Sequence, residues 1–311
     1  MNPVRFLTAP DVERLVGQID VLAVLRRAFH ALATKQAVQP PQTLTLLPNG
    51  AGDFITYLGA LADEKVLGAK ISPYLMANGG FVTAWTLLLS METGEPILLC
   101  DSKRLTTERT AATTALAVGL LAPKTAERLT VIGTGPIGQA HIRHALPLRP
   151  WREVRVFSRN LAALEARQAA LARMDPRIRV ETELGAAVHN ADVILLCTSS
   201  ATPVLDLAIL SKPALVTSVS SNAPGAHEIP PQSLPATDVY CDYRPTTPAT
   251  AGEMVIAAAE HGWSPAKVVG DLPELVAGRA AAPKYARHAF FRSIGLGLED
   301  VAVANALLLA Q

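Results

Sequence analysis

The sequence predicts an α/β protein that combines a doubly wound parallel sheet with a second domain of the α+β type. Two patterns support this fold class. From residue 129 onward, short apolar runs alternate with alanine-rich stretches of helical spacing, which is typical of βαβ units. Between residues 43 and 100, apolar runs follow one another with Gly, Asn and Asp turns between them, which indicates a mixed or antiparallel sheet.

Bulk properties limit the classes of protein that fit. The 311 residues suit two domains, and half of them are apolar, so each domain can bury a core. The net charge is +1 with no long run of one sign, which argues against nucleic acid or an anionic membrane as a partner. The cysteines Cys100, Cys197 and Cys241 match no zinc spacing and no disulfide framework. We expect a soluble cytoplasmic protein without a metal or a membrane span.

The expected elements divide into two sets. For the first domain they are a helical pattern over 9–35, strands near 43–47, 54–60, 69–74 and 86–90, a turn at 91–96 and a helix at 106–121. For the second domain they are strands near 129–132, 154–157, 193–197 and 215–219 and a solvated helix at 161–173. The apolar stretch 293–309 is expected to form a helix that returns to the first domain. The domains are therefore 1–115 with 293–311, and 116–292.

A glycine-rich loop follows the first strand of the second domain. The pattern G-x-G-x-x-G stands directly after a strand and directly before a helix, which is the context of the Rossmann dinucleotide-binding fold. Its glycines allow a tight turn, a close approach of backbone amides to a pyrophosphate and close packing of helix on strand. The loop residues expected to contact the cofactor are Gly133, Thr134, Gly135, Pro136, Ile137 and Gly138.

The end of the next strand bears on the choice of cofactor. An NAD site normally places Asp or Glu there for the ribose hydroxyls, whereas this sequence has Ser158, Arg159 and Asn160. A hydroxyl and a guanidinium suit a 2′-phosphate. We expect NADPH to be preferred, with NADH bound more weakly. Thr198 and Ser220, which follow later strands, complete the expected cofactor contacts.

Four further segments resemble the ornithine cyclodeaminase/mu-crystallin family, and they occur in the family's order along nearly the whole chain. They are Gly-Ala-Lys-Ile at 68–71, Leu-Thr-Thr-Glu-Arg-Thr-Ala-Ala at 105–112, Ser-Asn-Ala-Pro-Gly-Ala-His-Glu-Ile at 221–229 and Ser-Ile-Gly-Leu-Gly-Leu-Glu-Asp at 293–300. The resemblance implies a homodimer whose first domain binds the substrate and forms the dimer contact. It also implies hydride transfer with amino acids or cyclic imino acids as substrates.

The resemblance also implies roles for single residues. Lys70 and Arg109 match the family's cations that bind the substrate carboxylate, and Thr83 lies near a polar contact position. A planar guanidinium can grip a carboxylate with two hydrogen bonds, and the ammonium adds a point charge. Without the resemblance, either cation would be interpreted as a surface residue. Gln42 stands where many members carry an arginine, so one positive charge is missing from the expected substrate site.

Asn222 is a second departure, because cyclodeaminases carry an aspartate there. An amide cannot serve as a general base, and the loss of ammonia from ornithine needs more proton transfer than the reduction of a protonated C=N bond. We therefore expect a reductase of cyclic imino acids, with Δ1-pyrroline-2-carboxylate giving L-proline and Δ1-piperideine-2-carboxylate giving L-pipecolate. The alternatives are an ornithine cyclodeaminase or open-chain amino acid dehydrogenase, and an idle NADPH-binding protein of the crystallin kind. Glu228 is expected to have a structural role, and His141 with His144 is not expected to hold a metal.

Overall fold

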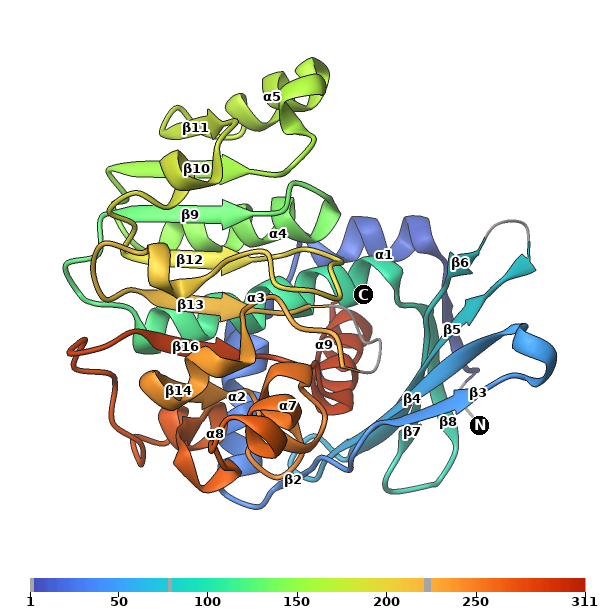
Figure 1. Cartoon of the computed structure of the whole chain (residues 1–311). Helices are drawn as coiled ribbons and strands as arrows, with labels where there is room; N and C mark the ends of the chain where they lie inside the picture. Colours follow the sequence, from blue (N-terminus) through green and yellow to red (C-terminus); the bar gives the residue numbers. More distant parts are fainter. Residues whose placement is uncertain (1–2, 78–79, 221–224, 311) are drawn as a thin grey trace. The chain divides into compact units, whose positions relative to one another are not determined.

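The computed structural model describes residues 3–77, 80–220 and 225–310 (Figure 1). The chain divides into two compact units, one made of Met1–Ala112 with Gly295–Gln311 and the other of Thr113–Ile294. Each unit has its own sheet. The α/β fold class expected from the sequence, with one parallel sheet of the Rossmann type and one α+β unit, is confirmed.

The sheet of the first unit is mixed. Its strands lie in the order β1-β8-β7-β5-β4-β2, with β3 beside β4 and β6 beside β5. The β1–β8 pair is parallel, and the pairs that β4, β5 and β7 make are antiparallel. The strands are β1 (Arg5–Leu7), β2 (Ala37–Val38), β3 (Thr43–Leu46), β4 (Gly52–Leu61), β5 (Val66–Leu75), β6 (Phe81–Val82), β7 (Trp85–Ser90) and β8 (Pro96–Asp101). The expected turn at 91–96 joins β7 to β8.

The helices of the first unit are α1 (Ala9–Val16), α2 (Val21–Ala33), α9 (Gly297–Leu309) and the first half of α3 (Lys103–Leu121), which continues into the second unit. Helix α9 packs on the central strands of the sheet, α1 packs on β1 and β8, and α2 packs on α9 and β2. The pattern over 9–35 thus forms two helices, because the Asp20 side chain accepts a hydrogen bond from the Ala23 amide and begins α2. Helix α9 packs on β4, β5 and α2 and begins four residues later than expected, after Gly295 with its φ of 77°.

The sheet of the second unit is parallel. Its strands lie in the order β11-β10-β9-β12-β13-β16-β14-β15. The first five strands of this order lie side by side in Figure 1. The first six strands match the doubly wound strand order. From β9 the chain adds strands first toward β11 and then, starting with β12, on the other side of β9. The strands are β9 (Arg128–Ile132), β10 (Glu153–Phe157), β11 (Ile178–Glu181), β12 (Val193–Leu196), β13 (Leu215–Ser218), β14 (Asp238–Cys241), β15 (Val268–Asp271) and β16 (Ala289–Arg292). The helices are α4 (Pro136–Ala145), α5 (Glu165–Ala172), α6 (Leu184–Val188), α7 (Gly252–Glu260) and α8 (Leu272–Val276).

Candidate functional site

The glycine loop of the second unit connects β9 to α4. Gly133 has a φ of 111°, and a Cβ on it would lie 2.4 Å from the Cys197 carbonyl oxygen. A Cβ on Gly138 would lie 2.0 Å from the Gly133 carbonyl oxygen, so the helix could not start this close to the strand with any other residue. Around Gly135, in contrast, an added Cβ would meet nothing within 4 Å. The turn therefore leaves no room for a side chain where it packs on its own sheet, but it leaves space at the amino end of α4.

This arrangement fits a dinucleotide. Pro136 occupies the first turn of α4, where no amide donor is needed, and Gly135 is the N-cap. The amide groups and the positive end of a helix dipole favour an anion such as a pyrophosphate. The loop also lies at the carboxyl end of β9, beside the position where the strand order reverses. Ile137 has a second role in the helix, because its carbonyl oxygen bonds the buried His141 ring.

The remaining expected cofactor residues lie at the carboxyl ends of neighbouring strands. The Ser158 hydroxyl, just after β10, lies 3.1 Å from the Thr134 hydroxyl of the glycine loop. Arg159 and Asn160 are exposed beside it. Thr198 follows β12, and Ser220 stands two residues beyond the end of β13. The structure therefore brings these residues to one edge of a single sheet, as expected for parallel strands.

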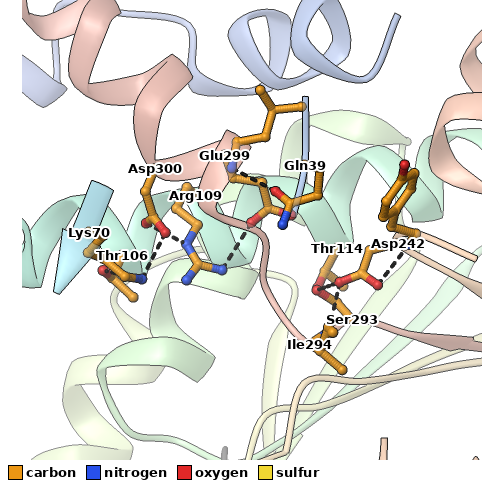
Figure 2. A network of polar contacts seen from close by, with 12 residues as sticks. Gln39, Lys70, Thr106, Arg109, Thr114, Asp242, Ser293, Ile294, Glu299 and Asp300 are labelled. Carbon is orange, nitrogen blue, oxygen red and sulfur yellow. Dashed lines mark hydrogen bonds and ion pairs between the residues drawn. The ribbon is translucent and has the colours of Figure 1, made fainter. Parts of the chain in front are cut away.

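Four charged side chains meet in the interior of the first unit (Figure 2). One carboxylate, that of Asp300, joins two cations: its Oδ2 lies 2.9 Å from Lys70 Nζ and its Oδ1 lies 3.0 Å from Arg109 Nε. Arg109 Nη1 donates to Glu299 Oε2 at 3.0 Å. Lys70 Nζ also lies 4.1 Å from the centre of the Tyr57 ring. None of the four charged residues exposes more than 4% of its surface.

Burial lowers the pKa of each of the two cations, and the neighbouring carboxylates raise it. Burial and the neighbouring Arg109 lower the pKa of Lys70 to about 8, although Asp300 and Glu299 partly offset this. Burial alone would also lower the pKa of Arg109, but the carboxylates of Asp300 and Glu299 raise it above its usual range. Lys70 is therefore the group of this cluster that can lose its proton near neutral pH, while Arg109 stays charged.

Two glycines of the 293–300 segment make room for the cluster. Gly295 lies against the guanidinium, since a Cβ there would be 2.3 Å from Arg109 Nη1. Gly297 lies against β4, since a Cβ there would be 2.4 Å from the Leu58 carbonyl oxygen. Helix α9 can therefore approach β4 closely and place Glu299 and Asp300, in its first turn, beside the cations. The Leu298 amide at this end of the helix donates to Gln39 Oε1 at 2.9 Å.

The other expected substrate residues have different surroundings. Gln42 is half-buried, and its Oε1 is a buried atom without a hydrogen-bond partner among the described residues. Thr83 is half-buried, and its backbone bonds Pro73 and Ser72. Asn222 lies outside the described residues. In the described part of the chain, no three His, Cys, Asp or Glu side chains are grouped so that they could hold a metal, and no helix is long and apolar enough to cross a membrane.

The roles of Glu299 and Asp300 were not predicted from the sequence. Both belong to a segment that was used only for the family resemblance. A signal was present, however, because two adjacent acidic residues stand in the first turn of an otherwise apolar helix. Carboxylates buried at such a place require cationic partners.

The fold and these residues together define a dinucleotide-binding protein of the Rossmann class, with the glycine loop in its second unit and a buried pair of cations in its first unit. The family model of the ornithine cyclodeaminase/mu-crystallin family matches residues 4–308. The chain belongs to this family.

Individual relatives agree with this assignment. An NAD(P)H-dependent anabolic L-arginine dehydrogenase of Pseudomonas aeruginosa is 58% identical over 298 residues, which cover 96% of this chain and 94% of the relative. A Δ1-pyrroline-2-carboxylate reductase of Colwellia psychrerythraea is 26% identical, with 98% of each chain covered. The solved structure of the Thermococcus litoralis Δ1-pyrroline-2-carboxylate reductase, in complex with NADH and L-proline, has the same fold, with a TM-score of 0.89, 21% identity and coverage of 98% of this chain and 96% of that one.

The family and its closely similar member settle the class of protein. The chain is an NAD(P)H-dependent oxidoreductase acting on C=N or CH–NH groups. The expectation of an enzyme, rather than of an idle binding protein, is confirmed.

Proposed function

We propose that the enzyme interconverts an open-chain α-imino acid and its L-amino acid, with a basic side chain of the arginine type as the preferred substituent. The buried cluster of two cations and two carboxylates carries this proposal. The carboxylate and the protonated C=N nitrogen of such a substrate together add no net charge to this cluster, so burying the two costs less than burying the carboxylate alone. The 58% identity to an L-arginine dehydrogenase supports the open chain and the basic side chain.

In this proposal each residue of the cluster has a defined task. Lys70 and Arg109 hold the substrate carboxylate, while Asp300 and Glu299 keep the two cations in place. Bound NAD(P)H supplies a hydride to the imine carbon. The carbon–nitrogen π electrons move to nitrogen as the new C–H bond forms, so a protonated imine gives a neutral amine that then takes a proton from water. Fixed orientation of the C=N carbon contributes much of the rate.

Cyclic imino acids are the second candidate substrates. The pyrroline-2-carboxylate reductase of Colwellia psychrerythraea aligns over 98% of this chain, which supports the reduction of Δ1-pyrroline-2-carboxylate to L-proline. The six-membered Δ1-piperideine-2-carboxylate is the other cyclic candidate. One methylene distinguishes these two rings, and an apolar pocket separates them only weakly. An amide at Asn222 supports either reduction over cyclodeamination, because it cannot accept a proton at neutral pH.

A substrate panel distinguishes these candidates. NADPH oxidation would be followed with 2-oxo-5-guanidinopentanoate plus ammonia, which form the open-chain imine, and with each of the two cyclic imino acids. We expect the guanidino substrate to give the highest kcat/KM and ornithine with a catalytic amount of cofactor to give no proline. A higher kcat/KM with either ring would assign the enzyme to cyclic imines, and conversion of ornithine into proline and ammonia without net formation of NADPH would assign it to the cyclodeaminases.

We also propose that NADPH is preferred to NADH, because Ser158 and Arg159 stand where an NAD site has a carboxylate. Changing Arg159 to Ala is expected to raise the KM for NADPH about 10- to 100-fold, since a hydrogen bond to a charged group contributes about 1.5–3 kcal/mol. The KM for NADH should change less than threefold. Initial rates with each cofactor test this. Equal kinetics with both cofactors in the unchanged enzyme would refute the preference.

We further propose a homodimer formed through the sheet of the first unit. The face of this sheet away from α9 is apolar and exposed: Leu58, Leu67 and Leu87 expose 46%, 40% and 37% of their surface. These side chains stand on neighbouring strands, since Leu58 lies opposite Ala69, which in turn lies opposite Leu87. On the same face, the rings of Phe6 and Trp85 stack at 5.9 Å. An apolar area of this kind favours contact with a second copy of the same face.

Replacing Leu67 and Leu87 together by Glu is expected to convert the dimer into a monomer, because the two charges would be buried in the contact. Light scattering after size-exclusion chromatography gives the mass directly. The matched control is Val255 and Val269 to Glu, two exposed apolar residues of the other unit, which should leave the mass unchanged. A monomeric unchanged protein, or a dimer that survives the first double change, would contradict the proposed contact.

A further inference from the structure

Glu228 holds together the chain segments that follow two neighbouring strands of the parallel sheet. The residue is completely buried. Its Oε1 accepts hydrogen bonds from the Thr198 amide at 2.8 Å and the Thr198 hydroxyl at 2.6 Å. Its Oε2 accepts from the Ser218 hydroxyl at 2.7 Å and the Ser220 amide at 2.9 Å. An ionised carboxylate can accept all four of these bonds, which a neutral amide cannot do.

Two of these bonds hold backbone amides that lie beyond the ends of strands. Thr198 stands two residues beyond the end of β12, and Ser220 stands two residues beyond the end of β13. Ser220 has a φ of 42°, in the left-handed region that disfavours residues other than glycine. A non-glycine residue keeps such a conformation only where its surroundings enforce it. The bond from its amide to Glu228 is one such constraint.

The segment fixed at Thr198 also lies against the glycine loop. A Cβ added to Gly133 would lie 2.4 Å from the Cys197 carbonyl oxygen and 3.3 Å from the Thr198 nitrogen. The Gly133 backbone and the 197–198 backbone are therefore in direct contact. A change in the position of Thr198 therefore alters the side of the glycine loop that faces β12.

The strand order shows which half of a dinucleotide would respond. In a doubly wound sheet each half of the strand order binds one mononucleotide, and the half with the glycine loop binds the adenosine. Here β9, β10 and β11 form that half, with Ser158 and Arg159 at its edge. Strands β12 and β13 begin the other half, which faces the nicotinamide mononucleotide. The four hydrogen bonds to Glu228 come from residues on or just after β12 and β13, and so from the nicotinamide half.

We infer that Glu228 is a positioning residue for the nicotinamide half of the cofactor site. It acts through Thr198 and Ser220, whose backbone it holds at the carboxyl edge of the sheet. The inference concerns the cofactor and does not depend on which imino acid is the substrate.

A comparison of two buried carboxylates tests this role. Glu228→Gln places an amide N–H group in a shell of donors, so the bond from the Ser220 or the Thr198 amide is lost. Asp271→Asn is the matched control, because Asp271 is also a buried carboxylate of this unit and accepts hydrogen bonds from the Arg244 amide at 2.9 Å and the Glu274 amide at 3.0 Å, but makes none of the four bonds. Calorimetry would give the Kd of each protein for NADPH and for 2′,5′-ADP, which carries only the adenosine half. NADH and 5′-AMP form the equivalent pair without the 2′-phosphate.

We expect Glu228→Gln to raise the Kd for NADPH at least tenfold and to change the Kd for 2′,5′-ADP less than twofold. Asp271→Asn should leave both values within twofold of the unchanged protein. Equal weakening of both ligands by Glu228→Gln would mean a general loss of structure and would overturn the inference, as would unchanged binding of NADPH. If Glu228→Gln does not fold, Ser218→Ala replaces it. This variant removes one bond to Glu228 from a completely buried side chain, and the same selective loss, about threefold, is expected.

Discussion

Replacing Arg109 by Lys is expected to lower kcat/KM nearly as far as replacing it by Ala, on the order of 100-fold or more. The guanidinium donates from Nε to Asp300 and from Nη1 to Glu299, both at 3.0 Å. A lysine ammonium is a single point and cannot reproduce this planar fork. Each hydrogen bond to a charged group contributes about 1.5–3 kcal/mol, and each 1.4 kcal/mol corresponds to about tenfold in rate. Steady-state kinetics on the reductive reaction measure the loss.

Two controls separate a role in the reaction from a loss of structure. Arg104 lies on the same helix, is partly exposed and pairs with Glu108 at 2.9 Å, so Arg104→Lys should leave kcat/KM unchanged. The glycine loop belongs to the other unit, so NADPH should bind both Arg109 variants with an unchanged Kd. An Arg109→Lys enzyme that retains kcat/KM within threefold would show that the guanidinium is not needed to hold the substrate.

The parts of the fold that could be predicted from the sequence are those encoded by nearby residues. The glycine loop needs only a strand, a turn and a helix start within ten residues, so its residues and its position at the carboxyl end of β9 follow from the pattern. The strands β3, β4, β5 and β7 follow in the same way from short apolar runs and the turns between them.

Contacts between distant residues escaped the pattern. Asp300 reaches Arg109 across 191 positions of the chain, and nothing near either residue encodes that contact. Strand β16 was missed for a similar reason: it lies between β13 and β14 although it is the last strand in the chain, so its place depends on partners far away in sequence. The break between α1 and α2 is a local feature that was overlooked, because the apolar spacing continues through it. Gly17, the C-cap of α1, and Asp20, the N-cap of α2, mark the break.

Removing the Asp300 charge is expected to move the alkaline limb of the pH–rate profile to lower pH. The charged form of Lys70 binds a carboxylate, and burial with Arg109 lowers its pKa to about 8, so kcat/KM should fall as the pH rises through this value. Asp300 acts in the opposite direction and raises the pKa of Lys70. In Asp300→Asn the pKa of Lys70 is therefore lower, and the fall in kcat/KM should begin about one pH unit earlier, which corresponds to 1.36 kcal/mol of lost interaction.

The profile of kcat/KM between pH 6 and 10 tests this, with folding checked by circular dichroism because a buried ion pair is broken. Titration of the imino substrate affects all variants equally, so the difference between profiles isolates the enzyme. Glu299→Gln is the matched control: Glu299 accepts a hydrogen bond from Arg109 and acts on Lys70 through its charge, so its shift should be in the same direction and smaller. An alkaline limb that stays in place in Asp300→Asn, or moves to higher pH, would show that protonated Lys70 is not required for the reaction.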